Sequence, residues 1–213
     1  RDQHARVVSM SLGGGGDASD PMSQTVDRLS RETGALFVIA AGNDGPHAIN
    51  SPGAADAALT VGAVDRDDRL APFSSRGPRV GDAAIKPDIT APGVNIAAAK
   101  AAQGQLGTPV ADGYVAMSGT SMATPHVAGA AALMAQLHPD WKGEQIKATL
   151  TASAKPNPKN NAFEQGSGRV DVAKALTQAV TTSPTNISLG TQLWPHDDDQ
   201  PVNKSVTYRN SGK

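Results

Sequence analysis

The sequence contains no cysteine, few aromatic side chains, no long hydrophobic run and no excess of either charge. The absence of cysteine excludes disulfide bonds, thiolate zinc sites and a cysteine nucleophile. Lysine and arginine total 19 against 20 aspartates and glutamates, which argues against a surface for nucleic acid or anionic membranes, since either needs clustered positive charge. No apolar run approaches the ~18 residues that a membrane-spanning helix requires.

Small residues are abundant instead. Aromatic residues make up only 3% of the 213 residues, whereas there are 22 glycines and 15 prolines. A core built from this chain must pack small side chains closely, with many tight turns. The length suits one large domain, or one domain and part of a second. The first residues run into an apolar stretch without a secretory signal, so we expect a mature fragment of a longer protein.

Apolar runs and helical patterns alternate along the first third of the chain. Residues 7–12, 36–40 and 59–64 are short apolar runs that predict strands, and the continuous run at 36–40 suits a strand buried on both faces. An Asp-Pro pair at 20–21 predicts the start of a helix that Gly34 ends. Strand, helix and strand at this spacing indicate an α/β fold with a parallel sheet.

The second half predicts more helices and then changes character. Helical patterns cover residues 121–136, 144–152 and 172–179. After a long loop, an alternating segment at 205–209 predicts an antiparallel strand. We assign residues 1–180 to the α/β domain and residues 181–213 to a linker and the first strands of a truncated β-sandwich-like module, because this tail is too short for a core of its own.

Ser121 lies between a glycine turn and the start of the longest helical pattern. A hydroxyl there sits at the positive end of the helix dipole, beside backbone N–H groups that have no intrahelical partner. This environment favours the negative charge that develops during acyl transfer. A serine at this position can also simply cap the helix, and for a Gly-Thr-Ser triplet alone that is the commoner explanation.

The eleven residues 119–129, Gly-Thr-Ser-Met-Ala-Thr-Pro-His-Val-Ala-Gly, resemble the nucleophile segment of the subtilisin-like serine proteases. Further segments follow in the family's order, so that the resemblance covers about residues 5–180. They are Met-Ser-Leu-Gly-Gly at 10–14, Ala-Ala-Gly-Asn at 40–43, Ser-Pro-Gly-Ala at 51–54, Val-Gly-Ala-Val at 61–64, Phe-Ser-Ser-Arg-Gly-Pro at 73–78 and Lys-Pro-Asp-Ile-Thr-Ala-Pro-Gly at 86–93. The resemblance implies a three-layer subtilisin-like domain, of which this chain carries the carboxyl-side portion.

The resemblance implies that the chain belongs to a serine endopeptidase that hydrolyses peptide bonds through an acyl-enzyme. Ser121 would be the nucleophile, and Asn43 would donate its side-chain amide to the oxyanion together with the backbone N–H of Ser121. Asn43 follows a predicted buried strand at its carboxyl end, where open α/β sheets bind ligands. Taken alone, an asparagine before Asp44 and Gly45 is also an ordinary turn former.

One glycine-rich segment is implied to bind substrate. Residues 11–13 would pair with an extended peptide as an added strand, because glycine lets another backbone approach closely. Without the family context, a plain turn explains this segment equally well. A specificity pocket would lie beside it, with Asp44 near the rim as a candidate for recruiting a basic side chain. The substrate-binding residues that the resemblance implies are Ser11, Leu12, Gly13, Ala41, Gly42 and Pro52.

The aspartate and histidine of the family's triad are missing from this chain. The family's order is Asp, His, Ser, and the histidines upstream of Ser121, His4 and His47, do not lie in a His-Gly-Thr-His setting. His126 follows Ser121 at i+5, where it points away around the helix, and the resemblance makes it a packed structural residue. We predict that the chain alone is inactive, because a serine without a base is a poor nucleophile, and that an amino-side portion of the same protease supplies base and acid.

The expected partners are protein or peptide substrates, the missing amino-side portion and a propeptide, with no nucleic acid. The resemblance implies secretion. We expect the chemistry to require no cofactor. The resemblance implies structural calcium, but the sequence contains no cluster of carboxylates from which calcium ligands could be assigned, so the metal site is unassigned.

Other functions fit parts of the sequence. Residues 13–18 satisfy G-x-G-x-x-A before a helix, a dinucleotide-binding fingerprint, although no acidic residue ends the second strand. Ser121 nearly fits the G-x-S-x-G of α/β-hydrolase esterases, whose acid and base would lie downstream, for example at Asp171 and His196. A catalytically inactive scaffold is the third alternative.

Overall fold

The centre of the molecule is a four-stranded parallel sheet in the order β1-β2-β3-β4. The structure is a computed structural model that describes residues 4–212. The strands are β1 (Val7–Met10), β2 (Leu36–Ala40), β3 (Leu59–Val64) and β4 (Ile89–Pro92). In β2, Val38 pairs with Ser9 of β1 on one side and with Leu59 of β3 on the other. The predicted α/β fold with a parallel sheet is confirmed.

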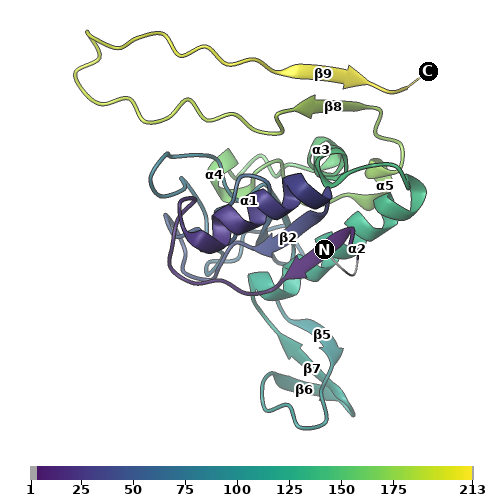
Figure 1. Cartoon of the computed structure of the whole chain (residues 1–213). Coiled ribbons are helices and arrows are strands. Elements are labelled where there is room, and N and C mark those ends of the chain that lie inside the picture. Colours follow the sequence, from purple (N-terminus) through teal and green to yellow (C-terminus); the bar gives the residue numbers. More distant parts are fainter. Residues whose placement is uncertain (1–3, 213) are drawn as a thin grey trace.

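Helices cover both faces of this sheet and produce three layers (Figure 1). Helix α1 (Pro21–Thr33) shares one buried cluster with Phe37 and Ile39 of β2. Helices α2 (Thr120–Leu137) and α3 (Gly143–Ser153) share the other cluster with the alternate β2 residues, Leu36 and Val38. Because successive side chains of a strand point to opposite faces, the two clusters lie on opposite sides of the sheet.

The ends of α1 follow from its sequence. The Asp20 carboxylate accepts a hydrogen bond from the Met22 N–H at 2.9 Å, which satisfies one of the free donors of the first turn. Gly34 adopts the left-handed conformation with φ 72°, and its N–H donates to the Ser30 carbonyl at 2.9 Å. Glycine adopts this conformation at little cost in free energy because it has no Cβ. The predicted first helix is confirmed with both caps.

A small antiparallel sheet projects from the body next to α2 (Figure 1). It contains β5 (Ile96–Ala99), β6 (Thr108–Ala111) and β7 (Tyr114–Met117), with β7 in the middle. The sequence patterns did not predict it. Strand β7 leads through two residues into α2, so the sheet flanks the amino end of that helix.

The carboxyl-terminal part contains two short helices and a two-stranded sheet on the opposite side of the body from β5–β7 (Figure 1). Its elements are α4 (Ala162–Gln165), α5 (Val172–Ala175), β8 (Val180–Ser183) and β9 (Thr207–Asn210). The predicted helix over 172–179 is wrong in length, because the N–H groups of Thr177 and Gln178 donate to carbonyls three residues back, and this tighter turn ends α5 before β8 begins. The antiparallel strand expected at 205–209 is confirmed as β9. The domain boundary at residue 180 stays a prediction, and so does the β-sandwich-like module.

Gly143 allows α3 to lie directly against β2. A Cβ on Gly143 would lie 2.7 Å from the Leu36 nitrogen, and backbone atoms cannot easily move away. We expect Gly143→Ala to lower the free energy of unfolding by about 1–3 kcal/mol in urea denaturation. The matched control is Gly129→Ala in α2, where nothing lies within 4 Å; there alanine should stabilise by about 0.5–1 kcal/mol. Equal effects of the two substitutions would contradict close packing at Gly143.

Candidate active site

Three segments that are far apart in sequence meet at the carboxyl edge of the sheet. The chain leaving β1 continues into Ser11, and the chain leaving β2 continues through Gly42 into Asn43. Helix α2 starts at Thr120 and brings Ser121 to the same place. This edge is where open parallel sheets bind ligands. The structure therefore brings together the predicted nucleophile, the predicted oxyanion donor and the first residue of the predicted substrate-binding segment.

Asn43 is held in one orientation by Thr120. Its side-chain Oδ1 accepts hydrogen bonds from the Thr120 N–H at 2.9 Å and from the Thr120 hydroxyl at 3.1 Å. Since a backbone N–H can only donate, the amide oxygen must face Thr120 and the Nδ2 group must face the other way. The Thr120 hydroxyl also accepts a hydrogen bond from the Gly42 N–H at 3.3 Å. Asn43 is thus an oriented donor next to Ser121.

The backbone N–H of Ser121 is available at the amino end of α2. The N–H groups of the two neighbouring residues already have acceptors: the Thr120 N–H donates to the Asn43 Oδ1, and the Met122 N–H donates to the Gly119 carbonyl at 3.0 Å. Within residues 4–212, the N–H of Ser121 has no hydrogen-bond partner. This N–H and the Nδ2 group of Asn43 are the two donors that the predicted oxyanion hole requires, and Thr120 links Asn43 to the same helix end.

Ser11 and Ser121 exchange two hydrogen bonds. The Ser11 hydroxyl donates to the Ser121 carbonyl at 2.8 Å, and the Ser121 hydroxyl donates to the Ser11 carbonyl at 3.2 Å. A carbonyl oxygen orients the nucleophile but cannot remove its proton, so Ser121 stays a neutral hydroxyl. Leu12, the next residue, is half exposed, and Gly13 is also exposed. Residues 11–13 consequently form an open segment that starts at the nucleophile.

The residues expected to wall the specificity pocket lie beside this segment. Gly14 and Ser51 exchange backbone hydrogen bonds of 2.9 and 3.0 Å, which bring the buried Pro52 next to the glycine run. Ala41 is fully buried, and its carbonyl accepts the Asn50 N–H at 3.0 Å. Ala41 can therefore shape the pocket through its backbone but not through an exposed methyl group.

Two residues with a place in this site were missed from the sequence. Thr120 orients Asn43, and its position directly before Ser121 was the only available signal. Asn50 places its side chain against Gly42, where a Cβ would lie 2.6 Å from the Asn50 Nδ2. No local pattern distinguishes Asn50 from an ordinary loop asparagine.

His126 is exposed, which corrects the expectation that it is packed. Its Nδ1 lies 2.9 Å from the Met122 carbonyl, one turn back on α2. The reason for its exposure is that no element of the described chain covers this face of the helix. The ring nitrogen is engaged by the backbone of its own helix and not by Ser121, so the structure offers no support for His126 as a base.

The residues of the α/β-hydrolase alternative and of the dinucleotide-binding alternative do not assemble a site. Asp171 caps α5 by accepting the Lys174 N–H at 3.0 Å, and His196 pairs with Asp199 at 2.8 Å in the loop between β8 and β9. This loop lies on the far side of the body from the amino end of α2 (Figure 1). For the dinucleotide alternative, the Gly14 N–H that would bind phosphate already donates to the Ser51 carbonyl.

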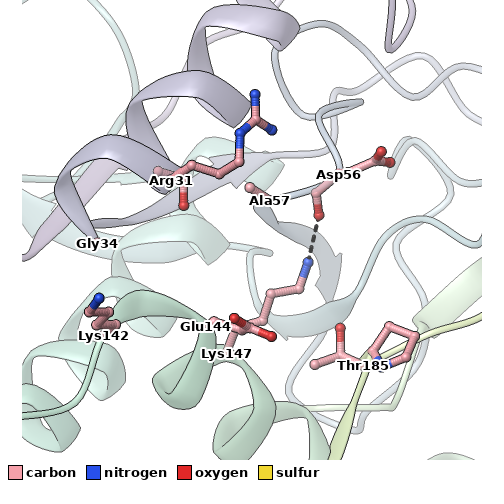
Figure 2. A pocket seen from close by; sticks show the side chains of 10 residues that line it. Arg31, Gly34, Asp56, Ala57, Lys142, Glu144, Lys147 and Thr185 are labelled. Atoms are coloured by element: carbon pink, nitrogen blue, oxygen red, sulfur yellow. Dashed lines mark hydrogen bonds between the residues drawn. The ribbon is translucent and has the colours of Figure 1, made fainter. Parts of the chain in front are cut away.

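A cavity of about 490 Å³ lies at the opposite, amino end of the strands (Figure 2). It is lined by residues that precede β2 and β3, such as Gly34 and Ala57, and by Lys142 and Lys147. The Lys147 ammonium donates to the Asp56 carbonyl at 3.0 Å and to the Ala58 carbonyl at 2.7 Å. Its donors are directed at the protein, so we assign this lysine a structural role.

Two negative findings concern metals and membranes. Among residues 4–212, no three His, Asp or Glu side chains gather into a group that could hold a metal ion. The expectation of structural calcium stays a prediction without assigned ligands. In the same part of the chain, no helix combines the length and apolar character that crossing a bilayer demands.

Comparisons with known proteins agree with this geometry. Serine protease AprX of Bacillus subtilis is 40% identical over 168 residues, which cover 70% of this chain and 38% of that protein. Subtilisin BL of Lederbergia lenta is 37% identical over 172 residues, covering 81% of this chain and 56% of that protein. Among solved structures, the prenylagaramide maturation protease PagA superposes with a TM-score of 0.69 at 31% identity, covering 83% of this chain and 62% of that one.

The chain thus spans about four to six tenths of the length of these relatives. The Peptidase_S8 model, described as the subtilase family, matches residues 1–168, which is most of the chain. The matched region contains the parallel sheet, the three layers and the edge at which residues 11, 43 and 121 meet. The chain belongs to the subtilase family of serine proteases.

Proposed function

We propose that this chain is the carboxyl-side portion of a serine endopeptidase that cleaves peptide bonds through an acyl-enzyme on Ser121. The observation that carries the proposal is the orientation of Asn43. Its Oδ1 is fixed by Thr120 at 2.9 Å, which leaves the Nδ2 donor free beside Ser121, whose own N–H is unpartnered within residues 4–212. Such preoriented donors stabilise the oxyanion of acyl transfer.

Substrate would bind along residues 11–13 as an added strand. The Ser121 oxygen attacks the scissile carbonyl carbon while its proton passes to a base. The oxyanion receives hydrogen bonds from Asn43 and from the Ser121 N–H. The C–N bond then breaks, the amine leaves with the proton, and water hydrolyses the acyl ester to restore the hydroxyl of Ser121.

The base and its orienting acid would come from a segment outside this chain. Strand β1 is the edge of the sheet, and within residues 4–212 its outer side has no strand partner. Leu133 and Leu137 of α2, which packs on β1, are 46% and 55% exposed. An open parallel edge next to exposed apolar side chains suits a further strand and helix. An amino-side portion docked there would reach the carboxyl edge where Ser121 lies.

The proposal extends to the location of the enzyme and its partners. A relative from Dichelobacter nodosus, 36% identical over 207 residues that cover 97% of this chain, carries the description extracellular basic protease. We propose that the present protease is likewise secreted, acts on proteins or peptides, is made with a propeptide, and needs no cofactor for its chemistry. Structural calcium belongs to the same proposal.

A fluorophosphonate probe tests the function directly, because it labels only an activated serine. We expect rapid labelling at Ser121, located by mass spectrometry, in the longer polypeptide that carries base and acid, and none after Ser121→Ala. The present chain alone should label slower by up to ~10⁶-fold, since a serine without its base is not activated. Absence of labelling in the longer polypeptide would overturn the proposal. Equally rapid labelling of the present chain alone would overturn the prediction that the base and the acid of the triad lie outside this chain.

A further inference from the structure

The tail that follows β8 changes from half-buried to exposed within a few residues. Residues 185–188 are half-buried, whereas every described residue from 189 to 212 is exposed. Thr185 lines two cavities, of about 490 and 210 Å³, at the amino end of the parallel strands. Figure 2 shows Thr185 and Lys147 in the lining of the larger cavity. The first part of the tail therefore lies on the body of the molecule, and only the remainder is open to solvent.

The side chain of Asn186 reaches the buried carboxylate of Asp88. The Asn186 amide nitrogen donates to the Asp88 Oδ1 at 3.0 Å, and the Lys147 ammonium faces the same oxygen at 3.3 Å. The Oδ2 atom accepts hydrogen bonds from the Lys86 ammonium at 2.7 Å and from the Thr60 N–H at 2.8 Å. An ionised carboxylate has about four acceptor positions. Asn186 therefore supplies the fourth donor, and it is the one donor of the four that comes from the tail.

Two further hydrogen bonds attach the tail on either side of Asn186. The Ser183 hydroxyl donates to the Glu144 Oε1 on α3 at 3.2 Å, and the Ser188 hydroxyl donates to the Asp82 carbonyl at 3.4 Å. Both bonds are long, and the first lies at an exposed position, so each contributes little. A bond to a charged group contributes more, and its loss leaves a buried acceptor without a partner. The attachment of the tail should therefore depend mainly on Asn186.

We propose that residues 183–188 are a strap that fastens the tail to the amino ends of β3 and β4, and that Asn186 is the residue that closes it. The strap does not depend on the function proposed for Ser121. Proteases cut exposed segments that can move away from the body. A closed strap confines such cleavage to residues beyond 188. A molecule cut there keeps Asn186, and with it the fourth donor to Asp88.

The chain contains no cysteine, so a single engineered thiol reports on a single position. Thr185→Cys places the thiol in the strap, and Thr191→Cys, in the exposed part of the same loop, is the matched control. Mass spectrometry follows the reaction of each thiol with iodoacetamide, a neutral reagent, and each rate is divided by the rate of the same variant unfolded in urea. We expect the thiol at position 185 to react about tenfold slower than the thiol at position 191, because it reacts only when the strap opens.

Asn186→Leu preserves the approximate size of the side chain and removes the donor. Combined with Thr185→Cys, it should raise the reaction rate about tenfold, to that of the control, while circular dichroism shows that the helices remain folded. Ser188→Ala, which removes only a weak outer bond, should raise the rate about threefold and decides the matter if Asn186→Leu does not fold. Equal normalised rates at positions 185 and 191, or a rate at 185 that neither substitution raises, would refute the strap.

Discussion

Replacement of Asn43 by alanine is expected to lower kcat of the active polypeptide by ~10²–10³-fold. That range was measured for an oxyanion-hole asparagine in a subtilisin, a relative of this chain, and is carried over here. The amide of Asn43 meets an oxygen that acquires full charge only in the transition state, so KM should change little. Steady-state kinetics on one good peptide substrate separate the two constants.

The control for this prediction is Asn203→Ala, an exposed asparagine in the loop before β9, which should leave kcat unchanged. A variant of Asn43 that raises KM while kcat stays constant would contradict the assigned role, because it would mean that the amide binds the ground state equally well. Circular dichroism and urea denaturation of the variant show whether a loss of kcat comes from unfolding.

The sequence predicted those parts of the fold whose signals are local. The continuous apolar run of β2 and the Asp20 and Gly34 caps of α1 each lie within a few residues, and both elements were placed correctly. The β5–β7 sheet was missed although the Asp-Gly pair at 112–113, which turns β6 into β7, is a local hairpin signal. Strand β5 consists largely of alanine, a weak strand former, and its Ile96 pairs with Met117 across a segment that contains β6. Long-range pairing of this kind leaves no periodic pattern in the sequence.

The candidate site, like the fold, was predicted only where its signals are local in the sequence. Ser121 and Asn43 were found because each lies in a segment that resembles the family, and the structure places both at one edge. The contact between Thr120 and Asn43 joins residues 77 positions apart, and no spacing rule connects Asn50 with Gly42, against which its side chain lies. The exposure of His126 depends on which elements cover α2, and that also cannot be read from the helix alone.

The buried charges under the sheet give the second large prediction. Asp88 is 3% exposed and lies 2.7 Å from the Lys86 ammonium and 3.3 Å from that of Lys147. Burial lowers the pKa of Lys86 to about 8, against the attraction of Asp88. For Asp88, burial acts to raise the pKa, but the charges of Lys147 and Lys86 outweigh it and hold the pKa below its usual value. The carboxylate is therefore the anion that keeps two cations inside the protein.

Asp88→Asn is expected to lower the free energy of unfolding by about 3–5 kcal/mol at pH 7, because it leaves two buried ammonium groups without a counter-charge. Urea denaturation of this chain measures the loss. The same substitution at Asp67, which pairs with the exposed Arg69, should cost less than about 1 kcal/mol. A loss at Asp88 no larger than that at Asp67 would mean that the lysines are neutral in the folded state, since neutral amines would not need the carboxylate.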